Sequence, residues 1–192
     1  MKGSFVFLAD GFEETEALAT LDVLRRGGIE ALLVSIDEEG MVTGSHGVTV
    51  AVDRTADDFA ALLHRGGTTE KDLMVFPGGM PGTKNLAATG WLMELMKEHF
   101  NEGGCVAAIC AAPGLVASRL DGLSGRKFTC YDGFQEQMLA KGAEYVKAPA
   151  VRDGNLITGR GAGCAVEFGL AILSYVKGEE TAASVRAALM LD

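Results

Sequence analysis

The sequence predicts an α/β protein in which a largely parallel sheet is covered by helices on both faces. Short apolar runs bounded by turn residues, typical of buried strands, alternate along the chain with longer segments of helical spacing. Hydrophobic residues make up 48% and charged residues 22% of the 192 residues, as in ordinary globular proteins with a full core. Because no linker, repeat or low-complexity tract interrupts this pattern, we expect one domain over residues 1–192.

The predicted strands are short, and most are apolar along their whole length. "GSFVFLAD" is typical, because its apolar run is closed by turn residues, as expected of a strand buried on both faces. "HGVTVAVD" instead alternates, which predicts a hairpin or an edge strand, and "RDGN" is typical of a hairpin turn. The predicted strands are residues 3–10, 30–37, 46–53, 72–79, 105–110, 125–134 and two strands within 143–160.

The predicted helices lie between these strands and at the end of the chain. In residues 12–30, Ala17, Leu21 and Leu24 share one helical face, acidic residues begin the segment, and two arginines and two glycines end it. The other predicted helices are residues 55–67, capped by Thr55, and residues 90–104, 112–120, 164–178 and 179–191.

Charge and composition exclude several classes of protein. A net charge of −9 argues against a nucleic-acid-binding surface, which needs clustered basic residues. No apolar run approaches the ~20 residues that a membrane span requires, and the N-terminus lacks an export cleavage pattern. The four cysteines have no CxxC spacing, which argues against a structural zinc site. We therefore expect no membrane, nucleic-acid or metal partner, and a cytoplasmic protein with reduced thiols.

Cys110 is the first candidate for chemistry. It ends the apolar run "CVAAIC" and precedes a predicted helix that has Pro113 in its first turn, so a tight turn would expose its side chain. The dipole of a helix start stabilises a thiolate, and thiols so placed can have a pKa lowered to roughly 3.5–7.5. The alternative is an inert thiol at the end of a core strand, and this stretch alone leaves the two readings equal.

The other cysteines and the histidines are weaker candidates. Cys105 lies on the opposite face of its strand and is expected in the core, and Cys130 is expected to pack there too. Cys164 is a real rival of Cys110, because it also begins a helix. His64 and His99 lie in predicted helices beside polar residues and are expected at the surface. His46 lies in a loop, "GSHGV", that can border a site.

Two further segments follow predicted strands, at the sheet edge where α/β proteins bind ligands. The glutamates of "DGFEETEA" are most simply helix caps, but a carboxyl group beside a thiolate would have a raised pKa and could move a proton. The adjacent glycines of "FPGGMPG" form either a tight turn or a set of free N–H groups of the kind an oxyanion hole needs. A Walker phosphate loop is absent.

Five segments in the same order resemble the ThiJ/PfpI superfamily, in the branch of the parkinsonism-associated protein deglycase and its bacterial relative YajL. They are "LADGFEETEALATLDVLRRGG", "FPGGMPG", "AAICAAPGLVA", "GRKFTCYDG" and "LITGRGAGCAVEFGLAI". The resemblance implies a flavodoxin-like three-layer sandwich made of one domain of the class I glutamine amidotransferase type. It also implies a homodimer that needs no cofactor.

Carried over residue by residue, the resemblance makes Cys110 the nucleophile and Glu16 its carboxylic acid partner. The backbone N–H groups of Gly79 and Ala111 would form the oxyanion pocket. Cys164 falls outside the nucleophile position of the family. Glu13 and Glu14 would play structural roles near the site.

The sequence also departs from the family pattern around the expected pocket. Ala111 stands where protease-like members have histidine, which argues against peptidase activity. Tyr131 stands where the parkinsonism-associated member has histidine, and His46 stands about where some members have arginine. Tyr131, His46 and Gly78 are therefore further candidates for the pocket wall. Because two of them differ from the family pattern, the resemblance does not fix the polarity of the pocket.

The implied activity is a cysteine-dependent glyoxalase or deglycase, a hydrolase acting on reactive carbonyls or on their thiol and amine adducts. It would protect the cell against carbonyl and oxidative stress. The alternative is a redox-responsive sensor or chaperone that uses the same oxidisable Cys110 without turnover. An amidotransferase-like module without its partner domain is less favoured, because no histidine adjoins Cys110.

Overall fold

A six-stranded sheet forms the centre of the molecule in a computed structural model, which describes residues 1–61 and 68–191. Five strands are parallel, and the edge strand β9 runs antiparallel to β10. Numbered among themselves, the parallel strands follow the order 2-1-3-4-5 of flavodoxin-like folds. In sheet order the strands are β2 (Ala31–Ser35), β1 (Ser4–Leu8), β5 (Leu73–Phe76), β6 (Cys105–Ile109), β10 (Leu156–Gly159) and β9 (Ala150–Asp153).

The apolar runs form strands that are buried on both faces, so the fold is an α/β sandwich of three layers. Neighbouring strands are in register, and one row across the sheet, from Val6 through Val75 and Ala107 to Ile157, packs under α1 and α7. The alternate residues of the same strands face the opposite core. The mostly parallel sheet with helices on both faces confirms the predicted fold class.

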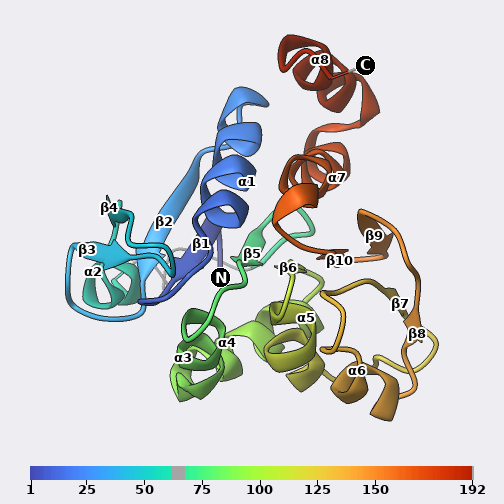
Figure 1. Ribbon diagram of the computed structural model, residues 1–192, viewed down its shortest axis with the longest axis horizontal. Coiled ribbons are helices and arrows are strands. Elements are labelled where there is room, and N and C mark those ends of the chain that lie inside the picture. Colours follow the sequence, from blue (N-terminus) through green and yellow to red (C-terminus); the bar gives the residue numbers. More distant parts are fainter. Residues whose placement is uncertain (62–67, 192) are drawn as a thin grey trace.

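Two groups of helices cover the sheet, as Figure 1 shows. The helices α1, α7 and α8 lie on one side, and α3, α4 and α5 lie on the other. No helix in the described ranges is both long and apolar enough to cross a membrane. The helices are α1 (Glu14–Arg26), α2 (Ala56–Ala60), α3 (Gly82–Ala88), α4 (Gly90–Asn101), α5 (Ala112–Leu115), α6 (Glu136–Ala140), α7 (Ala165–Lys177) and α8 (Glu179–Ala188).

The segment after Cys110 differs most from its prediction. Instead of one helix over residues 112–120, the chain forms the single turn α5 and then a 3₁₀ turn, Ala117–Arg119. Gly114, a poor helix former, lies in this turn because a Cβ there would come 2.2 Å from the Phe134 carbonyl oxygen. A one-turn helix has little dipole, so it cannot give the strong thiolate stabilisation that a full helix would.

The remaining differences concern short elements. The helices α3 and α6 have no counterpart in the prediction, and the end of the predicted helix 55–67, including His64, lies outside the described residues. The alternating segment 46–53 supplies β4 (Thr49–Ala51), which forms an antiparallel hairpin with the preceding β3 (Met41–Thr43). Residues 125–134 supply only β7 (Lys127–Phe128), which pairs with β8 (Glu144–Tyr145).

Candidate active site

The loops after β1, β5 and β6 meet at the carboxyl edge of the sheet. The strand order reverses between β1 and β5, and such switch points are where open α/β sheets bind ligands. The loop after β1 leads to Glu16, the loop after β5 contains Gly78 and Gly79, and Cys110 follows β6 directly. The structure therefore brings together three segments that the sequence placed at strand ends, which carry a carboxyl group, two glycines and a thiol.

Cys110 lies on a strained turn. Its φ of 64° is in the left-handed region, which non-glycine residues rarely adopt and which costs about 1–3 kcal/mol when the surroundings impose it. Its N–H donates to the Gly159 carbonyl oxygen at 3.0 Å, and its own carbonyl accepts the Tyr131 N–H at 2.9 Å. This geometry is the sharp strand-to-helix elbow that presents a nucleophile above a sheet edge.

Two backbone N–H groups point at the sulfur of this elbow. Those of Gly79 and Ala111 both hydrogen-bond to the Cys110 side chain. Gly79 has a φ of 92°, and a Cβ there would come 2.4 Å from the Glu13 nitrogen, so only glycine fits this position. Donors beside the sulfur can also stabilise negative charge on the oxygen of a carbonyl carbon that Sγ attacks, which is the task of an oxyanion hole.

Glu16 is buried beside the thiol, with only 1% of its surface exposed. Its Oε2 accepts the Gly78 N–H at 2.7 Å, and the carboxyl group also hydrogen-bonds to the Cys110 side chain. Its Oε1 is buried without a partner among the residues that the structure describes. A buried carboxyl with one free oxygen can hold or deliver a proton at this point.

Gly78 leaves space for the Glu16 carboxyl group and the Cys110 thiol to lie in contact. A Cβ at this residue would lie 2.6 Å from the Glu16 Oε2 and 2.9 Å from the Cys110 Sγ. Any side chain here would therefore stand between the carboxyl and the thiol. Gly78 borders the two reactive groups directly.

Burial and mutual charge set the protonation of the pair. Burial raises the pKa of Glu16 to about 7, although the hydrogen bonds from Gly78 and Cys110 oppose the shift. Burial, followed by the charge of Glu16, raises the pKa of Cys110 to about 12. The thiol pKa is therefore raised rather than lowered as the helix start suggested, because Cys110 is largely buried and the Glu16 carboxylate adjoins its sulfur. Between these values the pair shares one proton.

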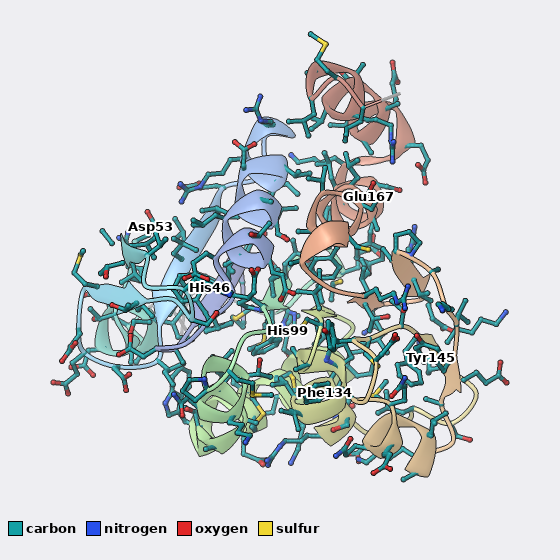
Figure 2. The ribbon with its side chains drawn as sticks, in the orientation of Figure 1. His46, Asp53, His99, Phe134, Tyr145 and Glu167 are labelled. Carbon is teal, nitrogen blue, oxygen red and sulfur yellow. The ribbon has the colours of Figure 1, made fainter. Side chains whose placement is uncertain are left out.

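Glu13 and Glu14 have structural contacts. Glu13 caps α1, since its Oε2 accepts the Glu16 N–H at 2.6 Å. Glu14 accepts the His46 N–H at 2.7 Å and contacts its ring Nδ1 at 2.9 Å, so the β3–β4 turn is fastened to the start of α1 (Figure 2). Burial raises the pKa of Glu14, but the hydrogen bonds led by that of His46 outweigh it and lower the value to about 2.

These residues also form the group best placed for a metal ion in the described part of the chain. One donor atom each of Glu13, Glu14 and His46 lies within 4.8 Å of the others. The contacts of Glu13 with the helix and of Glu14 with His46 already occupy these oxygens. These hydrogen bonds account for the position of Glu14 beside His46 and of Glu13 at the start of α1.

The other predicted residues lie around or away from this centre. Tyr131 is 54% exposed, and its ring lies close to Gly161, where an added Cβ would be 3.3 Å from the ring carbon Cδ2. Cys164 is partly exposed at the start of α7, whereas Cys105 and Cys130 are buried in the core as expected. Both buried thiols are 0% exposed, so reagents in solution do not reach their sulfurs, and burial raises the pKa of each.

His99 is not at the surface as the sequence suggested. It is fully buried, and its Nε2 lies 3.1 Å from the Cys105 carbonyl oxygen (Figure 2). Polar neighbours misled the prediction, whereas the spacing of His99 from the buried Leu92 and Met96 puts it on the core face of α4.

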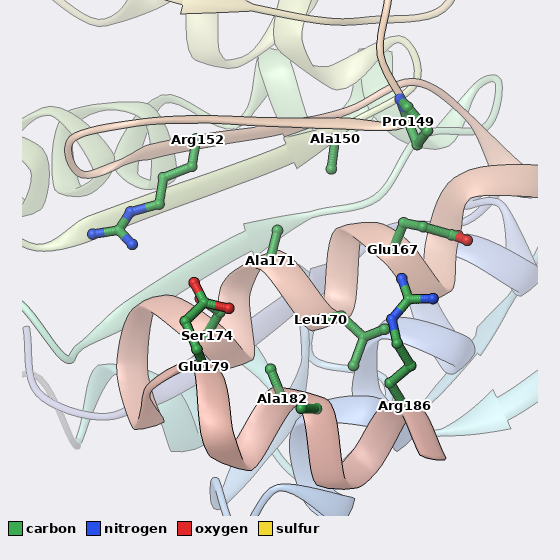
Figure 3. Close-up of a pocket in the computed structure, with 11 residues that line it drawn as sticks. Pro149, Ala150, Arg152, Glu167, Leu170, Ala171, Ser174, Glu179, Ala182 and Arg186 are labelled. Atoms are coloured by element: carbon green, nitrogen blue, oxygen red, sulfur yellow. The ribbon is translucent and has the colours of Figure 1, made fainter. Parts of the chain in front are cut away.

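A groove of about 540 Å³ lies elsewhere, between β9, α7 and α8 (Figure 3). It is lined by Arg152, Glu167 and Arg186 among others, and contains neither Cys110 nor Glu16. Its serine, Ser174, donates its hydroxyl to Glu179 at 2.6 Å. The groove is therefore separate from the reactive pair.

Comparison with known proteins finds relatives over the whole chain. The sequence profile of the DJ-1/PfpI family matches residues 4–175. A Parkinson disease protein 7 homolog of Danio rerio is 34% identical over 99% of this chain and 97% of its own. A protein named as a deglycase in Pyrococcus abyssi is 33% identical, over 81% of this chain and 87% of its own. The chain spans less than half the length of two DJ-1 homologs of Arabidopsis thaliana that are 33% identical to it.

Solved structures share the same architecture. A mutant of a DJ-1 superfamily protein from Salmonella typhimurium matches with a TM-score of 0.86 and 30% identity, over the full length of both chains. The DJ-1beta protein of Drosophila melanogaster matches with a TM-score of 0.85 and 32% identity, again over both full chains.

Proposed function

The chain belongs to the DJ-1/PfpI family, and from that premise we propose that it is a cysteine-dependent glyoxalase or deglycase with Cys110 as nucleophile. One observation carries the proposal: the strained elbow of Cys110 puts its sulfur beside the buried Glu16 carboxyl and in front of the Gly79 and Ala111 N–H groups. The substrates would be small reactive carbonyls or their adducts with amines and thiols. The deglycase name of the Pyrococcus relative supports this class of reaction.

The chemistry begins with proton transfer within the pair. The ionised Glu16 takes the thiol proton while Cys110 Sγ bonds to the aldehyde carbon of methylglyoxal, and the carbonyl electrons move to oxygen. The N–H groups of Gly79 and Ala111 stabilise this oxyanion, and removing one such donor costs roughly 3–4 kcal/mol of transition-state stabilisation in comparable sites. Covalent attack therefore needs no group beyond those of the chain.

Rearrangement and hydrolysis complete the cycle. Glu16 first returns its proton to the adduct oxyanion and becomes a carboxylate again. The carboxylate then removes the proton of the former aldehyde carbon and delivers it to the neighbouring carbon, while the hydroxyl proton moves to the second oxygen, which gives a lactoyl thioester. Water then cleaves the thioester, releases lactate and returns the thiol. The sum is methylglyoxal plus water to lactate, with no net oxidation.

Turnover of methylglyoxal tests this proposal. The wild-type protein should form lactate, and Cys110→Ala should abolish it. Cys164→Ala is the matched control, because Cys164 is also a partly exposed thiol at a helix start but lies outside the reactive pair. Equal rates in wild type and Cys110→Ala would disprove the proposal.

A redox role of Cys110 is the second candidate for the function of the protein. Cys110 is partly exposed, and a protonated Glu16 could donate a hydrogen bond to an oxidised sulfur. Mild peroxide should then add two oxygens selectively to Cys110, measured by intact mass and peptide mapping. Equal oxidation of Cys164, or none at Cys110, would remove this candidate, together with the sensor or chaperone function built on it.

The setting of the activity is also a proposal. Four free cysteines suit a reducing compartment, so we place the protein in the cytoplasm, where it would protect against carbonyl and oxidative stress. The family resemblance points to a homodimer, which light scattering in solution tests: the mass of a single chain would contradict it.

A further inference from the structure

Cys110 is held by backbone hydrogen bonds from two distant segments that are themselves joined. Its N–H donates to Gly159 at the end of β10, and its carbonyl accepts the N–H of Tyr131 in the loop after β7. The residues that follow these two partners, Arg160 and Asp132, pair with each other. Arg160 Nη2 lies 3.1 Å from both carboxylate oxygens of Asp132. The contacts form a closed ring around the elbow.

The ion pair lies at the surface and contributes little to global stability. The side chain of Arg160 is 32% exposed and that of Asp132 is 66% exposed, a setting in which ion pairs are weak. The base of the loop is attached independently, because the Thr129 N–H donates to the Thr158 hydroxyl at 2.9 Å in the buried interior. Loss of the pair would therefore release the loop tip and leave the fold intact.

We propose that Arg160 and Asp132 are positioning residues for Cys110. Their ion pair holds the Tyr131 loop against the end of β10, and so keeps Cys110 in the left-handed conformation that aims its sulfur at Glu16. Such a conformation persists only where the surroundings impose it, and these two segments supply the partners of both backbone groups of Cys110. The inference rests on the proposed function only in taking Cys110 as the reactive residue.

The rate of alkylation of Cys110 by iodoacetamide tests this role without any carbonyl substrate. In this reaction the sulfur displaces iodide and its proton passes to Glu16 or to solvent. Asp132→Asn and Arg160→Gln should each slow alkylation roughly tenfold, since small misplacements of a nucleophile have effects of this size or larger. The double variant should be no slower than the singles, because both remove one interaction. Arg160→Lys should retain part of the rate.

Arg26→Gln is the matched control. It removes another exposed arginine–aspartate pair, with Asp22 at 2.6 Å on α1, and should leave the alkylation rate unchanged. All variants should unfold within about 4 °C of the wild type, as expected when an exposed ion pair is lost. Peptide mapping assigns the label to each cysteine.

The outcomes separate this inference from the proposed function. Rates within twofold of wild type, additive losses in the double variant, or an equal loss in Arg26→Gln would overturn the positioning role. So would a wild-type Cys110 that reacts no faster than the buried Cys130. If the wild type forms no lactate but the variants still slow alkylation as described, the proposed activity fails and the positioning role stands.

Discussion

Glu16 and Cys110 act as one unit, because they lie in contact and share one proton between their pKa values of about 7 and about 12. Below the Glu16 pKa of about 7 both groups are neutral and no base is available. Above it, the carboxylate can accept the thiol proton as the sulfur attacks. The last proton leaves the pair only near the Cys110 pKa of about 12. Reactivity at this site should therefore follow the ionisation of a glutamate rather than that of a free thiol.

This assignment predicts the pH profile of the reaction. The value of kcat/KM for methylglyoxal, or the alkylation rate of Cys110, should rise tenfold per pH unit below about pH 7 and level off above it. In Glu16→Gln the step near pH 7 should vanish and the plateau should fall about 10²-fold or more, since the base is gone. An unchanged step in the variant would show that another group titrates.

Gly78 gives a residue-scale test of the space between the two groups. In Gly78→Ala the new Cβ would lie 2.6 Å from both Glu16 Oε2 and Cys110 Cβ, so the pair must separate. We expect lactate formation to fall at least tenfold. Gly90→Ala is the control, because a Cβ at Gly90 meets no atom within 4 Å and its φ is not positive. Equal activity in the two variants would contradict the close pairing.

Motifs identified the residues at strand ends, but not the contacts that hold them. Cys110, Glu16 and Gly79 follow apolar runs, so pattern and resemblance together singled them out before any geometry. No local sequence pattern indicates the hydrogen bond from Cys110 to Gly159 or the Arg160–Asp132 ion pair. These contacts join segments that meet only in the folded chain. Burial likewise reversed the expected direction of the Cys110 pKa shift.

At the scale of elements, α4 carries a histidine whose burial makes the fold sensitive to acid. The Nε2 of His99 bonds to the Cys105 carbonyl, while Nδ1 is buried with no partner in the described regions. Burial lowers the pKa of His99 below its usual 6.5. The folded state therefore resists protonation, and the contribution of His99 to stability is lost as the pH falls below 6.5.

Chemical denaturation at pH 7.5 and pH 5.5 tests this contribution. His99→Gln keeps an N–H donor for the Cys105 carbonyl but does not titrate, so its free energy of unfolding should fall less than that of wild type between the two values. Glu16 and His46 titrate in the same range, and both favour the folded state at lower pH. Both proteins contain Glu16 and His46, so their contributions to the free energy of unfolding cancel when the variant is compared with wild type. An equal fall in both proteins would contradict the role of His99.

Helices and strands with a clear hydrophobic pattern in the sequence were predictable, and the shortest elements were not. The helix α1 followed from its apolar face and end signals, and the strands β1, β5 and β6 followed from apolar runs. The helices α3 and α6 are two turns or less, too short to show a period. The predicted helix after Cys110 stopped after one turn because of a close tertiary contact at Gly114, which no local pattern reveals.

At the scale of the whole molecule, topology explains why the reactive groups meet. Alternating strands and helices predicted the parallel sheet, and a parallel sheet collects the loops after its strands at one edge. The order of the strands was not derivable from periodicity, and it came only with the resemblance. The reversal of that order between β1 and β5 opens the position that Glu16, Gly78 and Cys110 share.

The most direct test of the central claim is lactate formation from methylglyoxal by the purified chain, without glutathione or added metal. We expect steady turnover by the wild type and by Cys164→Ala, and none above background by Cys110→Ala. Turnover that persists undiminished in Cys110→Ala would contradict the claim that this elbow carries the reaction.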